Sequence, residues 1–464
     1  MSRKIISLLL VLVLTIFTFS GCGSKSNTDT ASTNEQNTAA TVENTAENST
    51  GAEQTASGDT IEIRFAWWGD TARNDVYNAI CDRFEEANPG IKVVREPSSW
   101  NDYFDKLATQ AAGNNAPDVF GMHVQYVSDY AGRGALAEIQ SYVDNGIIDT
   151  SKMSEAVVNS GKFGDKLYMI PQGVTFTNQL VNATLLEKYG IEVPKYDTDQ
   201  TWDEFKALGE QLVSKAKDAG EEAYISSDMS TQFTMFRYMA RQAGGDLYTA
   251  DGKLNFTQDT VEQWFTYWKT LRDEGLIPDA SSSTEDATAP VEQKFFTKGA
   301  VAFTCTPANQ LHLYQQQMPD FELTIARNPV GNDGARGEYL EGAHFAISSA
   351  SDDAKKEAAA KLINFFVNTQ ESMELFKMEQ GVPANSDMAE YIKTLLDETM
   401  TKEIDYVNAT IPVAGEGTYA PVGATEINTA FSDAAAGVQF GEVSPADAAK
   451  QFMEAAQTVL DSSN

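Results

Sequence analysis

Strand-like and helix-like patterns alternate along the chain from residue 61, and this alternation constrains the fold most. Residues 61–67 alternate apolar and other side chains, as a half-buried strand does. Val76, Ile80 and Phe84 follow at four-residue spacing, which is typical of one helix face. The order strand, helix, strand continues through residue 122. It predicts an α/β fold whose mainly parallel sheet is flanked by helices.

Ligands of such sheets bind beyond the carboxyl ends of the strands. Here those ends are residues 67–70, 96–100 and 123–126, and they combine aromatic and polar side chains. A second block begins near Gln172. Its clearest signal is Thr201-Trp202-Asp203-Glu204, a capping box that predicts a helix start.

The N-terminus is typical of a secretory signal. Arg3 and Lys4 precede an uncharged apolar run from Ile5 to Phe19. The run is shorter than the roughly 20 residues that an apolar helix needs to cross a bilayer. It ends in Phe19-Ser20-Gly21-Cys22, which resembles the bacterial lipobox apart from Phe19. We therefore expect a lipoprotein signal peptide at residues 1–21 and a lipidated Cys22; the alternative is a plain signal peptide with a chance cysteine.

Residues 22–59 are rich in Ser, Thr, Asn, Ala and Glu and contain no aromatic residue. Such a composition cannot bury enough apolar surface to offset ordering entropy, so we expect a disordered tether. The chain carries a formal net charge of −33. This charge argues against nucleic acid as a partner and against peripheral contact with anionic lipid. The sequence contains no metal-binding, P-loop or dinucleotide motif, so we expect no metal and no cofactor.

Short motifs in a fixed order resemble the extracellular solute-binding proteins of ABC transporters, in the sugar-carrying, maltose-binding-protein-like branch. They include Trp67-Trp68-Gly69-Asp70, Phe84 to Val93, Lys106 to Gly113, Ala116-Pro117-Asp118-Val119, Gly132 to Leu136, Gly164 to Pro171, Thr201 to Phe205, Phe296 to Ala302, Ala308-Asn309-Gln310 and Gly381-Val382-Pro383. Each motif alone is weak, but together they run through nearly the whole mature chain.

The resemblance implies a two-lobed type II periplasmic-binding-protein fold with a ligand cleft between the lobes. It places residues 60–170 and about 301–365 in the N-terminal lobe, and residues 171–300 and about 366–464 in the C-terminal lobe. It implies a carbohydrate ligand, delivery to an ABC permease, and a monomer on the extracellular face of the bacterial cytoplasmic membrane. It implies no catalysis.

A sugar offers apolar faces that pack on aromatic rings and hydroxyls that need polar partners. Under this resemblance, the first-lobe candidates are Trp67, Trp68, Asp70, Arg73, Trp100, His123 and Tyr126. The candidates from the crossing segment and the second lobe are Gln172, Phe176, Asn178, Gln232, Phe233, Asn309, Glu341, His344 and Tyr419.

Several of these assignments have alternatives. Trp67 lies on the same strand face as Ile63 and Phe65, so it can belong to the core, which makes Trp68 the better candidate. Arg73 would suit a uronate by bidentate pairing, or it can form a salt bridge with Asp70 or Asp75.

Two other functions remain open. A membrane-anchored glycoside hydrolase needs two carboxylates that flank the scissile bond, and 67 acidic residues leave room for such a pair. An adhesin or structural lipoprotein would need no aromatic residues in a cleft.

Overall fold

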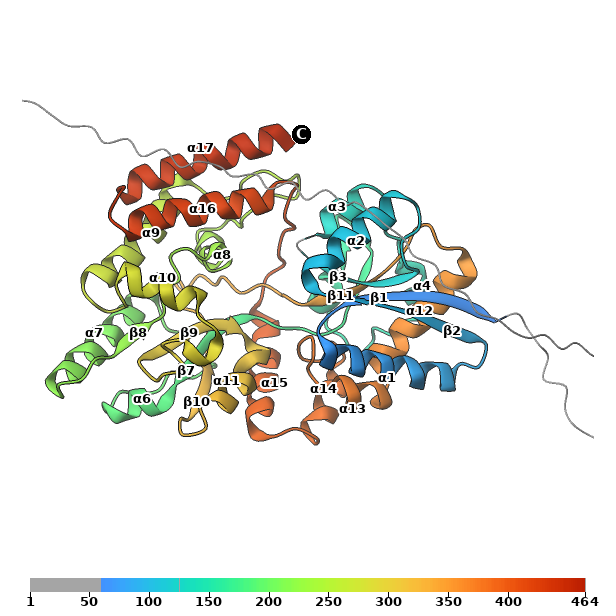
Figure 1. Ribbon diagram of the computed structural model, residues 1–464, viewed down its shortest axis with the longest axis horizontal. Coiled ribbons are helices and arrows are strands. Elements are labelled where there is room, and N and C mark those ends of the chain that lie inside the picture. The colour runs from blue at the N-terminus through green and yellow to red at the C-terminus, as the bar shows by residue number, and fades with distance from the viewer. Residues whose placement is uncertain (1–59, 125, 464) are drawn as a thin grey trace, which may run out of the picture. The chain divides into compact units, whose positions relative to one another are not determined.

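Two larger β-sheets, besides one of two short strands, organise residues 60–124 and 126–463, which are the residues that the computed structural model describes. The first sheet has the order β2 (Ile91–Ser98), β1 (Ile61–Trp68), β3 (Val119–His123), β11 (Ala343–Ile347) and β6 (Met169–Pro171). The second has the order β10 (Leu323–Ala326), β7 (Thr177–Asn182), β9 (Val301–Pro307) and β8 (Tyr224–Ser226). We call the parts around them the first lobe and the second lobe (Figure 1).

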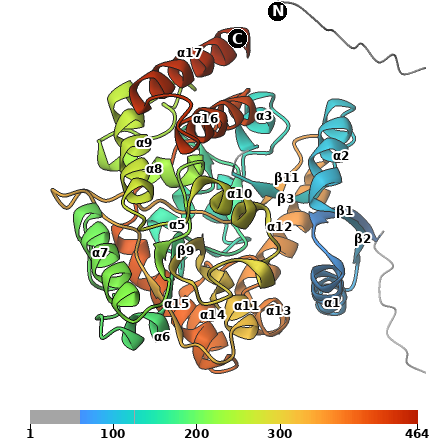
Figure 2. The same cartoon turned by 60° about the vertical axis from the view of Figure 1, so that its left-hand side comes forward.

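Helices cover both faces of the first sheet, as the alternation predicted. Ile63, Phe65 and Trp67 of β1 pack in one cluster with the buried face of α1 (Thr71–Ala87) and with α12 (Asp353–Asn368). Ala66 and Trp68 point the other way, toward α2 (Trp100–Ala112). Figure 2 shows α1 and α2 on opposite sides of β1.

The second lobe buries a separate apolar cluster beside its sheet. Its main helices are α7 (Trp202–Asp218), α8 (Phe233–Gln242), α9 (Gln258–Asp273), α16 (Ala424–Gln439) and α17 (Pro445–Ser463). The capping box at Thr201 and Glu204 is present and opens α7, as the sequence predicted. Likewise, the Ser444 hydroxyl accepts the Asp447 N–H at the start of α17.

Shorter elements complete the described chain. They are α3 (Val127–Gly132), α4 (Gln140–Asp144), α5 (Glu155–Asn159), β4 (Lys162–Phe163), β5 (Lys166–Leu167), α6 (Ala183–Lys188), α10 (Ala280–Thr288), α11 (Leu311–Gln317), α13 (Gln370–Phe376), α14 (Ser386–Lys393), α15 (Glu398–Thr410) and the 3-10 turns Val291–Gln293, Ala308–Gln310 and Ile411–Val413. Within these described residues, no helix is both long and apolar enough to cross a bilayer.

Both sheets are mixed. β1 runs parallel to β2 and β3, whereas β11 runs antiparallel to both of its neighbours. In the second sheet β8 and β9 are parallel, while β7 runs antiparallel to β9 and to β10. In the first sheet, the strands that the alternation identified pair in parallel, and β11, which joins from later in the chain, adds the antiparallel pairs.

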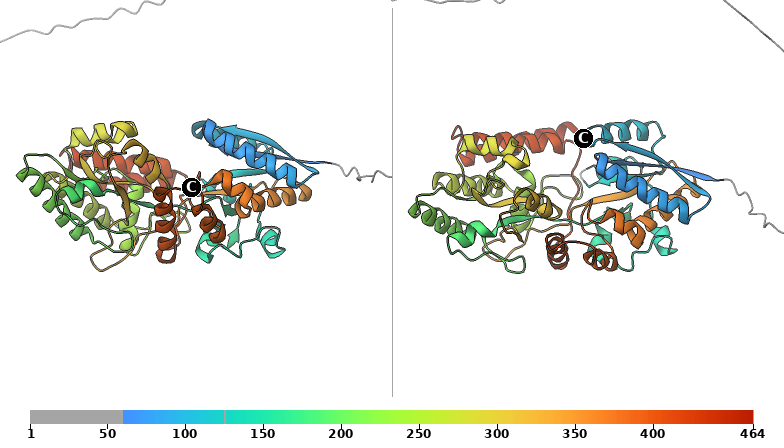
Figure 3. Two further views of the ribbon diagram at one scale, coloured as in Figure 1. Left: turned by 90° about the horizontal axis from the view of Figure 1, so that it is seen from below. Right: turned by 60° about the horizontal axis from the view of Figure 1, so that its bottom comes forward.

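The expected assignment of residues 301–342 to the first lobe is wrong, because β9 and β10 belong to the second sheet. The chain returns to the first sheet only at β11. It also stays in the first lobe beyond residue 365, since α13 packs against α1. In Figures 1 and 3 the blue N-terminal elements and the orange α12 and α13 accordingly gather on one side, with the green, yellow and red helices on the other. A strand pattern predicts that a strand exists but does not show which sheet it joins.

Three backbone segments cross between the lobes and touch one another. Val174 pairs with Val382, and Thr175 pairs with Glu341. The contact is close enough to require glycine at two positions. A Cβ on Gly342, whose φ is +146°, would lie 2.3 Å from the Gly173 carbonyl oxygen, and a Cβ on Gly381, whose φ is +112°, would lie 2.7 Å from that of Val174. Such short connecting segments are where hinge motions of two lobes occur.

A candidate ligand-binding cleft between the two lobes

A cavity of about 1740 Å³ is lined by residues of both lobes and of the crossing segments. Small-molecule pockets usually measure about 300–1,000 Å³, so the space suits a ligand larger than one sugar ring. Its wall combines apolar rings with hydroxyl, amide and carboxylate groups. This combination can pack on an apolar ligand face while it hydrogen-bonds the ligand's edge.

The first lobe contributes an aromatic cluster that consists of Trp68, Trp100, Phe104, His123 and Tyr126. The ring of Trp68 is buried and packs over Gly121, where a Cβ would lie 2.8 Å from it. Trp100 meets Trp68 and His123 edge-on, with ring centroids 5.4 Å away in each case. Tyr126 stacks on Phe104 at 3.9 Å. The neighbouring rings hold the Trp100 ring in place. Because Trp100 is 41% exposed, a large apolar surface of this ring remains open to the cavity.

His123 does not add a positive charge to this cluster at neutral pH. Burial lowers the pKa of His123 from its usual value to about 4. The ring lies at the end of β3 and lines the cavity. It can therefore offer a neutral imidazole to a ligand.

Across the cavity, two arginines of α8 share one carboxylate. Arg237 Nε and Nη2 donate to the Asp246 carboxylate at 2.5 and 3.0 Å, and Arg241 Nη1 donates to it at 2.6 Å. The Arg237 and Arg241 side chains are each only 12% exposed, and that of Asp246 is 4% exposed. Burial alone would raise the pKa of Asp246, but the two guanidinium groups hold it below its usual value. Asp246 thus neutralises much of the positive charge on this wall.

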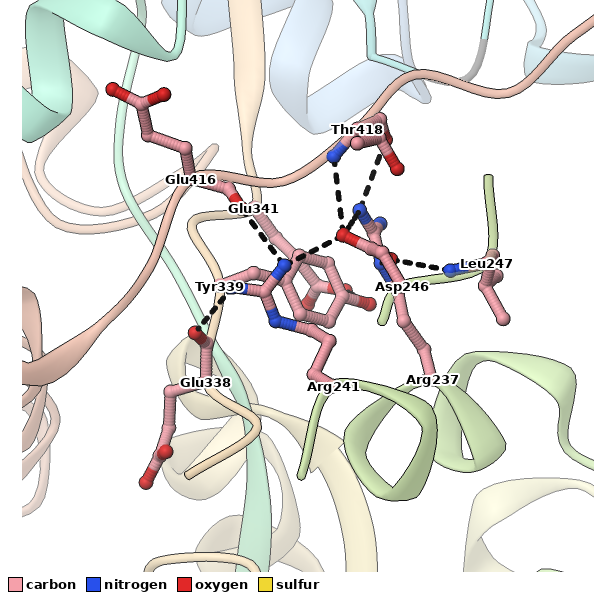
Figure 4. A network of polar contacts seen from close by, with 9 residues as sticks. All are labelled: Arg237, Arg241, Asp246, Leu247, Glu338, Tyr339, Glu341, Glu416 and Thr418. Carbon is pink, nitrogen blue, oxygen red and sulfur yellow. Dashed lines mark hydrogen bonds and ion pairs between the residues drawn. The ribbon is translucent and has the colours of Figure 1, made fainter. Parts of the chain in front are cut away.

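The same arginines hold a backbone segment in the cavity wall. We call residues 414–423, between α15 and α16, the strap. Arg237 donates to the Thr418 carbonyl at 2.9 Å, and Arg241 donates to the Glu416 carbonyl at 2.8 Å (Figure 4). On the other side, the Tyr419 hydroxyl donates to the Ser160 carbonyl of the first lobe at 3.0 Å. The strap therefore contacts both lobes and lines the cavity.

Tyr339 and Glu341 lie beside this network at the crossing segment. The Arg237 guanidinium carbon lies 3.8 Å from the centre of the Tyr339 ring, close enough for a cation–π contact. The Tyr339 hydroxyl donates to Glu341 Oε1 at 2.5 Å, and the Thr177 hydroxyl donates to Glu341 Oε2 at 2.8 Å. Burial raises the pKa of Tyr339, which keeps its hydroxyl protonated as a donor. These contacts orient the Glu341 carboxylate at the cavity surface.

Ten residues that the sequence suggested do line this cavity, and they come from both lobes and the strap. They are Trp68, Arg73, Trp100, His123, Tyr126, Gln232, Phe233, Asn309, Glu341 and Tyr419. Arg73 is already engaged, because its Nε donates to Glu379 Oε1 at 2.8 Å. Neither Asp70 nor Asp75, the partners considered from the sequence, forms that ion pair.

Six other candidates do not line the cavity. They are Trp67, Asp70, Gln172, Phe176, Asn178 and His344. Trp67 and Phe176 belong to the apolar core. Asp70 caps α1 through the Arg73 N–H, and Gln172 accepts the buried Tyr77 hydroxyl at 2.5 Å. Asn178 is fully buried on β7, and His344 contacts the Ser160 hydroxyl at 3.0 Å.

The sequence interpretation missed Arg237, Tyr339, Thr177 and most of the strap. A signal was available for Arg237, because it lies one helical turn after Phe233 on α8 and so faces the same way. No local signal identifies the strap, which is positioned by contacts with residues about 180 positions earlier in the chain.

We expect a pH effect from the buried His344. Burial lowers its folded-state pKa to about 4 from the usual 6.5, so the unfolded chain takes up the proton first. The contribution of His344 to the free energy of unfolding should therefore be fully present above pH 6.5. It should decline as the pH falls toward 4, by at most about 1.4 kcal/mol per pH unit. Urea unfolding at pH 7 and pH 5 checks this, and His344→Gln should make the decline shallower. An equal decline in both proteins would contradict the assignment.

The sequence profile of the bacterial extracellular solute-binding proteins matches residues 68–373. The diacetylchitobiose binding protein DasA of Streptomyces coelicolor is 26% identical over 318 residues, which cover 66% of this chain and 68% of that protein. A maltooligosaccharide ABC transporter solute-binding lipoprotein of Streptococcus pneumoniae is 22% identical over 341 residues, which cover 71% of this chain and 74% of that protein.

A solved structure of an extracellular solute-binding protein family 1 member from Alicyclobacillus acidocaldarius superimposes with a TM-score of 0.73 at 27% identity. The superposition covers 87% of this chain and 99% of that one. The two-lobed fold, the cavity between the lobes and the matched profile agree, and the chain belongs to the bacterial extracellular solute-binding protein family.

Proposed function

We propose that this protein captures an oligosaccharide in the cavity between its lobes and delivers it to an ABC permease, without catalysis. The observation that carries the proposal is the exposed Trp100 ring, fixed by Trp68 and His123, across from the hydrogen-bonding groups of the second lobe. Such a pairing of ring and polar groups fits the two kinds of surface on a sugar. The diacetylchitobiose and maltooligosaccharide relatives support the same ligand class.

Ten of the residues suggested by the sequence form the proposed ligand surface, and Thr175, Thr177, Arg237, Tyr339 and the strap extend it. The volume of about 1740 Å³ favours an oligosaccharide over a single ring. Because the wall belongs to both lobes, a bound ligand would stabilise their closed arrangement. We propose that the permease recognises this closed arrangement.

A thermal-shift screen over neutral mono- and oligosaccharides tests the proposal. A ligand that binds only the folded state raises the melting temperature, by an amount that grows with its concentration above Kd. We expect an oligosaccharide to raise the melting temperature and to be recovered intact by chromatography. If no sugar raised it, the proposed ligand class would be wrong. If the sugar were cleaved, the chain would be a hydrolase instead.

We further propose that a lipid on Cys22 holds the protein as a monomer on the outer face of the cytoplasmic membrane. Cys22 and the expected signal peptide and tether lie outside the described residues, so the support is the lipobox-like sequence and the lipoprotein named among the relatives.

Cys22→Ala should move the protein from the membrane pellet to the soluble fraction, because two acyl chains are what makes such anchoring stable. Fractionation followed by immunoblotting measures this, with Cys305→Ala as the control that keeps Cys22. Continued sedimentation of the Cys22→Ala protein with membranes would show that the anchor is something else.

A further inference from the structure

The cations at the cavity surface are few, and most of them are engaged. Eight acidic and four basic side chains line the cavity. Arg73 pairs with Glu379, Arg237 pairs with Asp246, and Lys294 donates to the Asp286 carbonyl at 2.9 Å. Within residues 60–124 and 126–463, this leaves Lys162 as the lining cation whose side chain forms no ion pair or hydrogen bond.

The acidic side chains that line the cavity outnumber the basic ones, and half of them have no ion-pair partner among the described residues. Four of the eight have a cation within ion-pair distance: Asp129, Asp228, Asp251 and Glu379. The other four, among them Glu341, have no such partner in the part of the chain that the structure describes. The surface that meets a ligand is therefore negative, and it lacks the unpaired arginines that bind carboxylates in bidentate fashion.

Glu341 is one of these four carboxylates without an ion pair, and hydrogen bonds fix its position. The Tyr339 and Thr177 hydroxyls each donate to one of its oxygens, so it is held in one orientation with further lone pairs available. Glu341 also lies where a crossing segment pairs with Thr175, between the two lobes. A carboxylate accepts hydrogen bonds and donates none, so it suits ligand hydroxyls and repels ligand carboxylates.

We infer that Glu341 determines specificity in this cavity, by selecting uncharged oligosaccharides against uronate-bearing oligosaccharides of the same length. This inference rests on the proposed function. Arg73, which the sequence left as a possible uronate partner, cannot serve that purpose while Glu379 holds it.

The test is calorimetric titration of the wild-type protein with two sets of oligosaccharides of equal length, one neutral and one made of uronic acids. We expect the best neutral ligand to bind at least about tenfold more tightly than its uronate counterpart. Glu341→Gln keeps the shape of the side chain and removes its charge. Loss of charge-assisted hydrogen bonds should weaken neutral binding about tenfold, and loss of repulsion should leave uronate binding equal or stronger.

The ratio of the two affinities is the informative quantity, because a purely structural defect would weaken both ligands equally. Glu341→Asp retains the charge and should retain the preference, and Glu398→Gln, at a side chain that is 87% exposed, is the matched control. Uronates that bind the wild type as tightly as neutral sugars would overturn this inference and leave the proposed function intact. An unchanged ratio in Glu341→Gln would overturn the role of Glu341. Failure of every oligosaccharide to bind would instead overturn the proposed function.

Discussion

Asp246→Asn is expected to lower the free energy of unfolding by about 3–5 kcal/mol, because it leaves two buried guanidinium groups without their shared carboxylate. Asp246 is 4% exposed on its side chain and accepts from both Arg237 and Arg241. It also accepts the Thr418 N–H at 3.3 Å, so the strap depends on it as well. Equilibrium unfolding in urea measures the change, and weaker ligand binding should accompany it.

The matched control is Asp273→Asn, which removes a carboxylate from a helical ion pair with Lys269. Those side chains are 60% and 38% exposed. Exposed pairs of this kind contribute roughly 0–1 kcal/mol, so the control should be nearly neutral. If Asp246→Asn cost no more than Asp273→Asn, the shared carboxylate would not be what stabilises this wall.

Trp100→Ala is expected to weaken oligosaccharide binding by about 2 kcal/mol or more, as truncation of a central aromatic contact usually does. That loss corresponds to roughly a 30-fold higher Kd. The stability of the free protein should change much less, since the Trp100 ring is 41% exposed and the buried Trp68 remains packed beneath it. Calorimetric titration with the ligand found by screening measures the effect.

Phe440→Ala is the control for this variant. Phe440 is 50% exposed and follows α16, and it is not among the residues that line the cavity. Its removal should leave Kd unchanged. A Trp100→Ala protein that still bound with wild-type affinity would show that the sugar does not pack on this ring.

The alternation along β1 contained much of the information on the first lobe. It separated Trp67 from Trp68, and the structure confirms that these rings lie on opposite faces of the sheet. Side chains alternate along the crossing segment too, but the sequence did not show which of its two faces meets the cavity. The sequence interpretation chose Phe176 and Asn178, whereas Thr175 and Thr177 line the cavity. Since side chains alternate with a period of two, a shift of one residue exchanges the buried and the exposed set.

Long-range pairing could not be predicted in this way. The pairing of β9 with β7 and β8, for example, depends on residues far away in the chain. Two other contacts also join residues far apart in the chain. Arg73 pairs with Glu379, and Arg237 and Arg241 hold the strap. Periodicity and capping depend on neighbours a few residues away, whereas such contacts depend on how whole elements pack.

An oligosaccharide held between the two lobes should draw them together. Small-angle scattering of the protein, with and without saturating neutral oligosaccharide, tests this most directly, because hinge closure at the crossing segments makes the folded part more compact. We predict a smaller radius of gyration with ligand, and a smaller decrease in Trp100→Ala at the same ligand concentration, because its roughly 30-fold higher Kd leaves most of the variant unliganded. A radius of gyration that stayed constant while the wild-type protein was saturated would contradict the account.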